Sequence, residues 1–353
     1  MLKLDLYIGR TIALAIGAVL LVILGLDIVF AIVDQLGEFE RGYGLAEAVQ
    51  YVIWTLPARI YGQLGFSALV GCMVGLGTLA GTSELTVMRA AGVSIGRIAW
   101  AVMKPILVLI MSGLALAEFV IPKTNAIAEG NKARALGELE ASGLERGLWL
   151  RDSGEFVHFN AALPDGALYG VTRYQFGDNR ELERVEFSER GQFTGQQWSL
   201  ENSRITSFSA QNSHSAQLPT SAWKAEISPE LFALIVPLPS DLSPRNLWSY
   251  ATFLDRKGED ASRYWLQFWK KLLQPLTIAA LVMVAISFIF GPLREVTTGL
   301  RVFAGIIVGI VFQTVQDMLG PSSLVFGFPP FLAVLLPIVL CFAAGWLLLK
   351  RAR

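Results

Sequence analysis

The sequence predicts an α-helical membrane protein with six transmembrane helices and a β-sheet domain inserted between the third and fourth helices. Hydrophobic residues make up 53% of its 353 residues, charged residues only 16%, and the mean hydropathy is +0.50. Soluble globular chains carry about a quarter charged residues. The charges are also unevenly placed, because 19 of the 29 acidic residues fall between positions 126 and 263. A soluble domain is therefore set into a membrane chain.

Six apolar segments are long enough to cross a bilayer, which takes about 20 mostly apolar residues in a helix. The predicted spans are residues 11–33, 60–80, 98–121, 272–290, 302–319 and 330–349. The first is too long for the apolar part of a cleaved signal peptide, so we interpret it as a transmembrane helix. Asp27 and Glu118 fall inside spans, where acidic groups are costly, and both are candidate functional residues.

The placement of lysine and arginine predicts the orientation, because these residues concentrate on the cytoplasmic side of membrane proteins. One side holds ten of them: Lys3, Arg10, Arg89, Arg97, Lys104, Arg294, Arg301, Lys350, Arg351 and Arg353. The short loops of the other side hold Arg41, Arg59 and Lys123. Both termini and residues 81–94 are therefore predicted to be cytoplasmic. The large insert is predicted to lie outside, which is the periplasm in a Gram-negative bacterium.

Lys270 and Lys271 depart from this rule, since they fall at the outer end of span four beside Trp265 and Trp269. Tryptophans are typical of the membrane interface, and lysines there can extend to the headgroups. Alternatively, one lysine faces a cavity and meets an anionic ligand. Glu118 lies at the same depth as Lys271, which gives the hypothesis of a Glu118–Lys271 pair.

The insert has the pattern of a β-sandwich or jelly roll. GLWLRDSGEFVHF predicts two strands around a turn, and LYGVTRYQF, RVEFSERGQF, QWSLE and SAWKAEI predict further strands. Residues 126–140 are predicted to be helical, and 243–263 to lead back to span four. The predicted organisation is residues 1–125 for spans one to three, 126–263 for the insert with its connecting segments, and 264–353 for spans four to six.

The sequence offers no convincing catalytic or metal site. No HExxH, GxSxG or Walker A pattern (GxxxxGK[ST]) occurs, so the chain does not hydrolyse a nucleotide by the Walker route. We interpret His158, one of two histidines, as a surface or edge residue of a strand. Cys72 and Cys341 lie in apolar runs, where the expected role is that of a small buried hydrophobe. Equal numbers of basic and acidic residues argue against nucleic-acid binding.

Residues 81–94, GTSELTVMRAAGVS, predict a short capped helix at about 84–91, between spans two and three. We expect Ser83 to cap its first free N–H groups and Glu84 to be favourable at its positive end. Gly92 suits the left-handed residue that closes a helix.

A helix of about 12 Å is marginal by itself, so this segment must dock on something. Leu85, Met88 and Ala91 recur every three residues on one face. Either the helix lies at the membrane surface as a turn, or this apolar face enters a cleft in a cytoplasmic partner.

Small residues four apart let helices approach closely. Span two contains Gly71, Gly75, Gly77 and Gly81, and span five contains Gly305 and Gly309. The pattern leaves open whether these contacts lie within the chain or against a second subunit.

The stretch SELTVMRAAGVS resembles the coupling helix of the lipopolysaccharide export permeases, the LptF/LptG family. Similar segments run along nearly the whole chain: LDLYIGRTI at 4–12, VDQL at 33–36, GLW at 147–149, WKKLLQPL at 269–276, SFIFGPLR at 287–294 and LVFGFPP at 324–330. The order of three spans, a β-domain and three spans is also that of the family. LDLYIGRTI, VDQL, SFIFGPLR and FGFPP resemble the LptG branch more than the LptF branch.

The resemblance implies a permease subunit of an ABC transporter that extracts lipopolysaccharide from the outer leaflet of the Gram-negative inner membrane, in cell envelope biogenesis. Such permeases form an LptF–LptG heterodimer on two copies of the ATPase LptB. Their periplasmic β-jellyroll domains lead toward a bridge through LptC and LptA, and spans one and five form lateral gates. The chain is then not an enzyme and binds no cofactor, since ATP and Mg²⁺ belong to the ATPase.

The same resemblance implies which residues contact the ATPase and the substrate. The ATPase-coupling residues would be Ser83, Glu84, Leu85, Val87, Met88, Arg89, Ala91 and Gly92. Relatives often carry lysines around VDQL that suit substrate phosphates, whereas here those positions are Ala31, Gly37 and Glu38. Phosphate binding is therefore assigned to Arg41, Arg59, Lys132, Arg134 or Lys271, or to the partner subunit, because cations suit phosphates. The predicted lipopolysaccharide-contact set also includes Asp34 and Glu118.

Two other functions compete with this one. The first is another ABC-type permease, of the lipoprotein or mechanotransmission type, which usually has four spans per chain. The second is a non-transporting membrane scaffold for a periplasmic complex, which predicts no ATPase partner. Co-purification with a cytoplasmic ATPase would exclude the scaffold. Accumulation of lipopolysaccharide in the inner membrane on depletion would exclude the other permease type.

Overall fold

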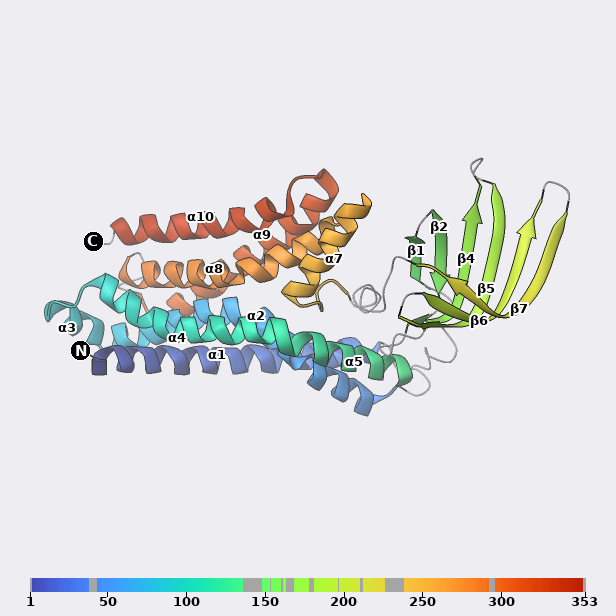
Figure 1. Cartoon of the computed structure of the whole chain (residues 1–353). Coiled ribbons are helices and arrows are strands. Elements are labelled where there is room, and N and C mark those ends of the chain that lie inside the picture. The colour runs from blue at the N-terminus through green and yellow to red at the C-terminus, as the bar shows by residue number, and fades with distance from the viewer. Residues whose placement is uncertain are drawn as a thin grey trace. The chain divides into compact units, whose positions relative to one another are not determined.

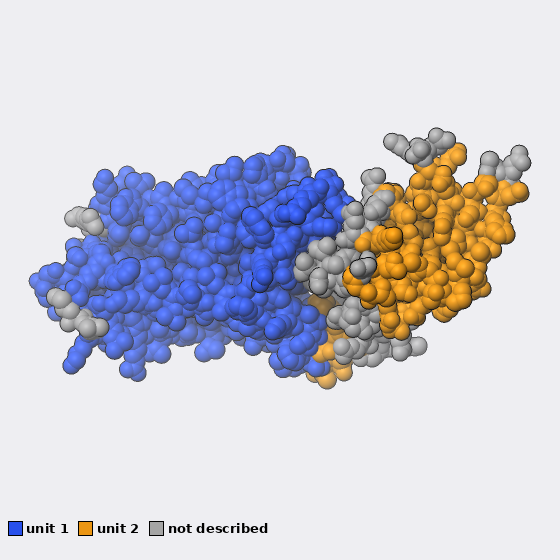
Figure 2. Space-filling view, in the orientation of Figure 1, with its two compact units in different colours: residues 1–39, 48–128, 239–353 blue, residues 40–47, 129–238 orange. Residues whose placement is uncertain are grey.

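The predicted fold class is confirmed, because six long apolar helices flank an antiparallel β-domain inserted after the third of them. The computed structural model describes residues 2–37, 43–135, 148–152, 154–159, 161–162, 168–177, 181–195, 197–209, 212–225, 238–291 and 296–351. The chain divides by its internal contacts into two units, which Figure 2 shows in different colours. The helical unit comprises residues 1–39, 48–128 and 239–353, and the β-unit comprises 40–47 and 129–238.

The helices before the β-domain are α1 (Leu2–Leu36), α2 (Leu45–Gly81), α3 (Glu84–Ala90), α4 (Ile95–Ala115), the π-helical turn η1 (Leu116–Val120) and α5 (Ile121–Ala135). Those after it are α7 (Pro244–Lys257), α8 (Ser262–Phe290), α9 (Thr298–Phe326) and α10 (Pro330–Arg351). Within the described ranges, six segments qualify as membrane spans: Lys3–Leu36, Leu45–Gly81, Ile95–Lys132, Ser262–Phe290, Gly299–Phe326 and Pro330–Arg351. In Figure 1 the start of α1, the end of α10 and helix α3 lie at the same end of the helical unit.

Side chains and glycines fix several helix ends. Ser94, Ser243 and Thr297 each accept a hydrogen bond from the backbone N–H three residues later, at the starts of α4, α7 and α9. Gly258 and Gly327 end α7 and α9 with φ of 72° and 71°, a left-handed conformation that favours glycine.

Helix α7 is amphipathic and packs on α8. Its buried side includes Leu247, Leu254 and Tyr250, and burial raises the pKa of the Tyr250 hydroxyl. On its exposed side, the ring of Trp248 packs edge-on against Trp265, with the centroids 5.1 Å apart. These aromatic rings extend the tryptophan cluster that the sequence places at the membrane interface.

Glycines bring the backbones of α1 and α2 into direct contact. A Cβ atom added at Gly71 would lie 2.5 Å from the Cα of Ile16, and one at Gly75 would lie 2.8 Å from the Cδ1 of Ile12. Gly71 can therefore not be replaced without moving α1, whereas at Gly75 the end of the Ile12 side chain would have to shift, and both close contacts lie within the chain.

Helix α9 packs on the same helix α2 in a similar way. A Cβ at Gly305 would lie 2.5 Å from the Sδ of Met73, and one at Gly309 would lie 2.6 Å from the ring of Phe66. The sequence left open whether its six spaced glycines pack within the chain or against a second subunit. Four of them, those at the contacts of α2 with α1 and α9, pack within the chain.

The β-unit contains a single antiparallel sheet in its described part. Its strands are β1 (Leu148–Asp152), β2 (Glu155–Phe159), β3 (Ala161–Ala162), β4 (Leu168–Phe176), β5 (Leu182–Phe193), β6 (Trp198–Phe208) and β7 (Ser213–Trp223). The strand order is β1-β2-β4-β5-β6-β7 (Figure 1). The short strand β3 pairs with β4. Alternate residues of these strands build an apolar core: Val157, Phe159, Leu168, Val171, Trp198, Leu200 and Trp223.

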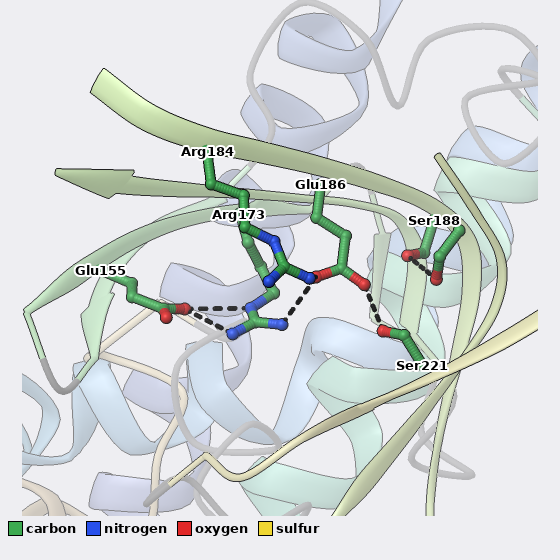
Figure 3. A network of polar contacts seen from close by, with 7 residues as sticks. Glu155, Arg173, Arg184, Glu186, Ser188 and Ser221 are labelled. Atoms are coloured by element: carbon green, nitrogen blue, oxygen red, sulfur yellow. Dashed lines mark hydrogen bonds and ion pairs between the residues drawn. The ribbon is translucent and has the colours of Figure 1, made fainter. Parts of the chain in front are cut away.

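A buried polar network crosses this sheet beside the apolar core (Figure 3). Arg173 donates from Nη2 to Oε2 of Glu155 at 2.7 Å and from Nη1 to Oε2 of Glu186 at 2.9 Å. Arg184 forms a longer ion pair with Glu186 at 3.6 Å, and Ser221 donates to the same carboxylate. Because Glu186 is only 2% exposed, its charge depends on these partners.

Candidate functional site

Helix α3 begins without the predicted serine cap. It starts at Glu84, but Ser83 before it has φ of 62°, in the left-handed region, and its side chain makes no capping hydrogen bond. An N-cap needs extended backbone to aim its oxygen at the first free N–H groups, so the prediction for Ser83 is wrong. Thr82 interacts with this end instead, donating from its hydroxyl to Oε1 of Glu84 at 2.9 Å.

The other end of α3 closes as predicted. Gly92 has φ of 85°, and its N–H donates to the carbonyl of Arg89 at 3.0 Å. The N–H of Val93 donates to the carbonyl of Met88 at 3.0 Å, which completes a Schellman motif. Because Ser94 then caps α4, the turn from α3 into α4 has defined hydrogen bonds on both sides.

The two faces of α3 have opposite environments. Leu85 is only 4% exposed and belongs to the core of the helical unit, and Met88 packs against that core. Val87 is 66% exposed, and Arg89 and Ala91 are exposed as well. The prediction that Leu85 projects toward a partner is therefore wrong, because the periodicity identifies an apolar face but not the direction in which it points. The outward surface of α3 is built around Val87.

Charged groups tie this end of the unit together. Asp5 of α1 forms ion pairs with Lys104 at 2.8 Å and with Arg97 at 3.7 Å, both on α4. Helix α3 is thus joined to α4 by the Schellman turn, and α4 is joined to the start of α1 by the ion pairs of Asp5.

A cavity of about 320 Å³ opens between α2, α8 and α9 within the helical unit. Of its 19 lining residues, 11 have polar or charged side chains. The polar side chains that line it are Tyr61, Ser240, Asp241, Gln267, Lys270, Lys271, Gln274, Thr277, Gln313, Gln316 and Asp317. Polar groups facing a cavity between spans are typical of a substrate path.

Several of these side chains interact with one another. Lys270 lies 3.9 Å from Asp317, and Gln313 donates to Asp317 at 3.1 Å. Gln274 donates to the carbonyl of Tyr61 at 2.9 Å. Among the described residues, the buried hydroxyl of Tyr61 has no hydrogen-bond partner. The wall thus combines fixed and unsatisfied polar groups.

Lys271 is neither extended to the headgroups nor free for a ligand. It is 5% exposed, and its Nζ donates to the carbonyl of Leu242 at 2.6 Å. The neighbouring Asp241 accepts from Nδ2 of Asn125 at 2.8 Å. Both Asp241 and Glu118 interact electrostatically with the lysine, but these described side chains show no direct Glu118–Lys271 ion pair. Lys271 therefore fixes the segment that leads into α7.

Replacing Lys271 with methionine is expected to loosen the start of α7. The variant keeps the side-chain length but leaves the Leu242 carbonyl without its donor, at a cost of about 1–3 kcal/mol for a buried polar group. Faster hydrogen exchange at residues 243–250 would report the loss. Lys270→Met is the matched control, because Lys270 is part-exposed and its ion pair is long, so exchange there should stay unchanged. Equal exchange in the two variants would contradict the assignment.

Arg59 and Asp27 form a pair that sequence reasoning missed. Nη1 of Arg59 donates to Oδ2 of Asp27 at 3.0 Å, and Nε of Arg59 donates to the hydroxyl of Thr55 at 3.2 Å. The sequence offered no partner for Asp27. The sequence could have indicated this pair through the depth of each residue in the membrane. Because α1 and α2 run antiparallel, residue 27 of α1 and residue 59 of α2 lie at the same depth.

Of the four remaining predicted substrate residues, the structure describes the side chains of two. Asp34 is exposed on α1, and the Lys132 ammonium lies 6.0 Å from the ring centre of Tyr43 in the β-unit. Arg41 falls outside the described residues. Arg134 belongs to α5, but the described part of the structure does not include its side chain.

The helical unit thus combines six long apolar helices, a short helix α3 with an exposed outward face, and a cavity lined by polar side chains. A model of the family "Lipopolysaccharide export system permease LptF/LptG" matches residues 6–351. The chain is 33% identical to lipopolysaccharide export system permease protein LptG of Escherichia coli K12, over 99% of this chain and 98% of the relative. It is 32% identical to the protein of that name from Haemophilus influenzae, over 99% of both. The chain belongs to the lipopolysaccharide export system permease LptF/LptG family.

Proposed function

We propose that the chain is the LptG-like permease subunit of an ABC transporter. This transporter extracts lipopolysaccharide from the outer leaflet of the inner membrane and passes it to a periplasmic bridge. The observation that carries the proposal is the family match, which covers residues 6–351 and thus both the spans and the β-unit. The six apolar helices and the polar cavity between α2, α8 and α9 support it.

The proposed location is the inner membrane of a Gram-negative bacterium, with both termini in the cytoplasm and the β-unit in the periplasm. The concentration of lysine and arginine at one set of helix ends supports this orientation. The start of α1, the end of α10 and helix α3 lie at one end of the helical unit, as the orientation requires (Figure 1).

The proposed partners are an LptF-like permease, two copies of an LptB-like ATPase, and LptC-like and LptA-like bridge proteins. ATP and Mg²⁺ bind the ATPase, and this chain neither binds a cofactor nor catalyses a reaction. The exposed surface around Val87 supports an ATPase contact, because an exposed apolar side chain on a short, well-defined helix is a suitable anchor for a groove.

In the proposed coupling, the ATPase holds the outward surface of α3 while Leu85 anchors the same helix in the bundle. Closure of the ATPase dimer displaces α3 as a rigid element. The Schellman turn passes the displacement to α4, and Asp5 with its partners Lys104 and Arg97 passes it to α1. Repacking of α1 against α2 then changes the space available to the lipid.

A substitution on the outward surface of α3 tests the coupling. Val87→Asp is expected to weaken association with the ATPase about 30-fold, because a central anchor residue contributes about 2 kcal/mol. The measurement is co-purification of the ATPase and ATP-driven release of lipopolysaccharide from proteoliposomes to the bridge proteins. Lys350→Asp, exposed at the same end of the unit, should leave both unchanged. Undiminished ATPase binding by the Val87 variant would exclude this docking surface, and a wild-type complex that releases no lipopolysaccharide would exclude the function.

A further inference from the structure

The Asp27–Arg59 pair joins α1 to α2 inside the spans and leaves part of the guanidinium open. The two side chains are 28% and 24% exposed. Nε is directed to Thr55, whose own hydroxyl donates to the carbonyl of Tyr51 at 3.1 Å, so the guanidinium plane is held from the α2 side. No residue in the described ranges accepts a hydrogen bond from Nη2. An acceptor approaching the exposed edge would therefore find free donors.

The pair lies near the outer edge of the hydrocarbon core on the orientation proposed above. At 1.5 Å per residue, α1 is about 52 Å long, much longer than the core of about 30 Å. If the core begins after the basic residues Lys3 and Arg10, Asp27 lies about 6 Å below its outer edge. Headgroup phosphates of outer-leaflet lipids come within reach of a long arginine side chain at that depth.

The surroundings of the pair allow it to open. The cytoplasmic-side half of α1 packs closely on α2 at Gly71 and Gly75, and the pair lies beyond these close contacts. Pro57 lies two residues before Arg59 and removes one hydrogen bond of α2, which makes this point a site of bending. An ion pair in an apolar environment is also only weakly net stabilising, since each charge has lost its hydration.

We propose that Arg59 binds a phosphate group of the transported lipid and that Asp27 occupies its guanidinium until the lipid arrives. This proposal rests on the proposed function. A phosphate offers more charge and more acceptor oxygens than a carboxylate, and it matches two parallel N–H groups of arginine. The lipid first meets the free Nη2 edge and then takes Nη1 from Asp27.

The exchange releases the outer half of α1 from α2. The exposed side of α1 is rich in large apolar residues: Leu21, Val22, Leu26, Val29, Phe30 and Val33. Such a surface can move along acyl chains without exposing polar groups. Entry of a phosphorylated lipid is therefore coupled to movement of the helix that the lipid passes.

The exchange predicts effects of opposite sign for the two partners. Asp27→Asn removes the competitor, so affinity for the phosphorylated lipid should rise by about threefold to tenfold. The size of this gain is the inverse of the fraction of time in which Arg59 is not paired with Asp27 in the wild type. Arg59→Gln removes the ligand, so affinity should fall by about tenfold or more. A pair with a purely structural role would lose affinity in both variants.

The test uses the complete complex with the partner permease and the ATPase in nanodiscs. The probes are lipopolysaccharide with both lipid A phosphates, the same lipopolysaccharide dephosphorylated, and phosphatidylglycerol. Glu259→Gln is the matched control, because it neutralises an exposed carboxylate of the helical unit on a different segment, between α7 and α8, and it should bind like the wild type. Asp27→Glu should restore wild-type affinity.

A distance measurement reports the opening directly. Spin labels at Val33→Cys on α1 and Ile53→Cys on α2 occupy exposed positions, after replacement of Cys341. The distance should lengthen with phosphorylated lipopolysaccharide but not with the dephosphorylated form. In Asp27→Asn it should already be long without lipid.

Three outcomes would overturn the proposal. Affinity changes of the same sign in Asp27→Asn and Arg59→Gln would leave the pair structural. Equal responses to phosphorylated and dephosphorylated lipopolysaccharide would exclude phosphate as the ligand, and an equal opening by phosphatidylglycerol would exclude selection of the transported lipid. In each of these cases the wild-type complex would still release lipopolysaccharide with ATP, so the proposed function would be unaffected. A wild-type complex that neither binds nor releases lipopolysaccharide would overturn the proposed function as well.

Discussion

Leucine in place of Gly71 is expected to prevent α1 from seating on α2. Even a bare Cβ at this position would lie 2.5 Å from the Cα of Ile16, and backbone cannot yield as a flexible side chain does. Overpacking of a core typically costs about 1–3 kcal/mol, and a full leucine against backbone should exceed that range. The measurement is the yield of monodisperse complex with the partner permease and its midpoint of thermal unfolding.

Gly62 supplies the control for this expectation. It lies nine residues earlier on α2, and a Cβ there would meet no atom within 4 Å. Gly62→Ala should therefore assemble normally, whereas Gly71→Ala should already lower the unfolding midpoint. Normal assembly of Gly71→Leu would mean that α1 does not contact α2 at this point.

Loss of Arg173 is the second large effect that we expect. Arg173→Leu leaves the buried Glu186 with only Ser221 and the distant Arg184, and removing one partner of a buried pair costs about 3–5 kcal/mol. The sheet should open around β4 and β5. Hydrogen exchange of residues 182–193 in the full chain would measure the loss of protection.

Two comparisons separate the network from a general effect of removing an arginine. Arg204→Leu removes an exposed arginine from β6 and should leave the exchange unchanged. The double variant Arg173→Leu with Glu186→Leu should recover part of the protection, because replacing both charges of a buried pair is often close to neutral. If the double variant is no better than Arg173→Leu, packing rather than charge explains the loss.

Hydropathy made most of the fold predictable. The six spans and the inserted β-domain follow from long apolar runs and short alternating ones, and these signals do not depend on contacts between distant residues. Gly92 was predictable for a similar reason, because a left-handed helix end has a strong local preference for glycine.

The site was less predictable because its features depend on tertiary contacts. Ser83 has the right residue type for a cap, but the tight link from α2 places it in the left-handed region. The period of the apolar residues on α3 could not show that Leu85 faces the bundle. The partners of Asp27 and Lys271 come from segments 32 and 29 residues away, and the contact of Lys271 is to a backbone carbonyl that no side-chain pattern encodes.

The π-helical turn η1 gives the chain one surplus residue between α4 and α5. A π-helical turn is wider than an α-helical one, so the residues after it are turned about the helix axis. Without that residue the helix would continue at 3.6 residues per turn, and every side chain of α5 would rotate by about 100°. Asn125 would then no longer point at Asp241, the neighbour of the carbonyl that Lys271 binds. A single residue thus determines which side chains of α5 face the segment that returns from the β-domain.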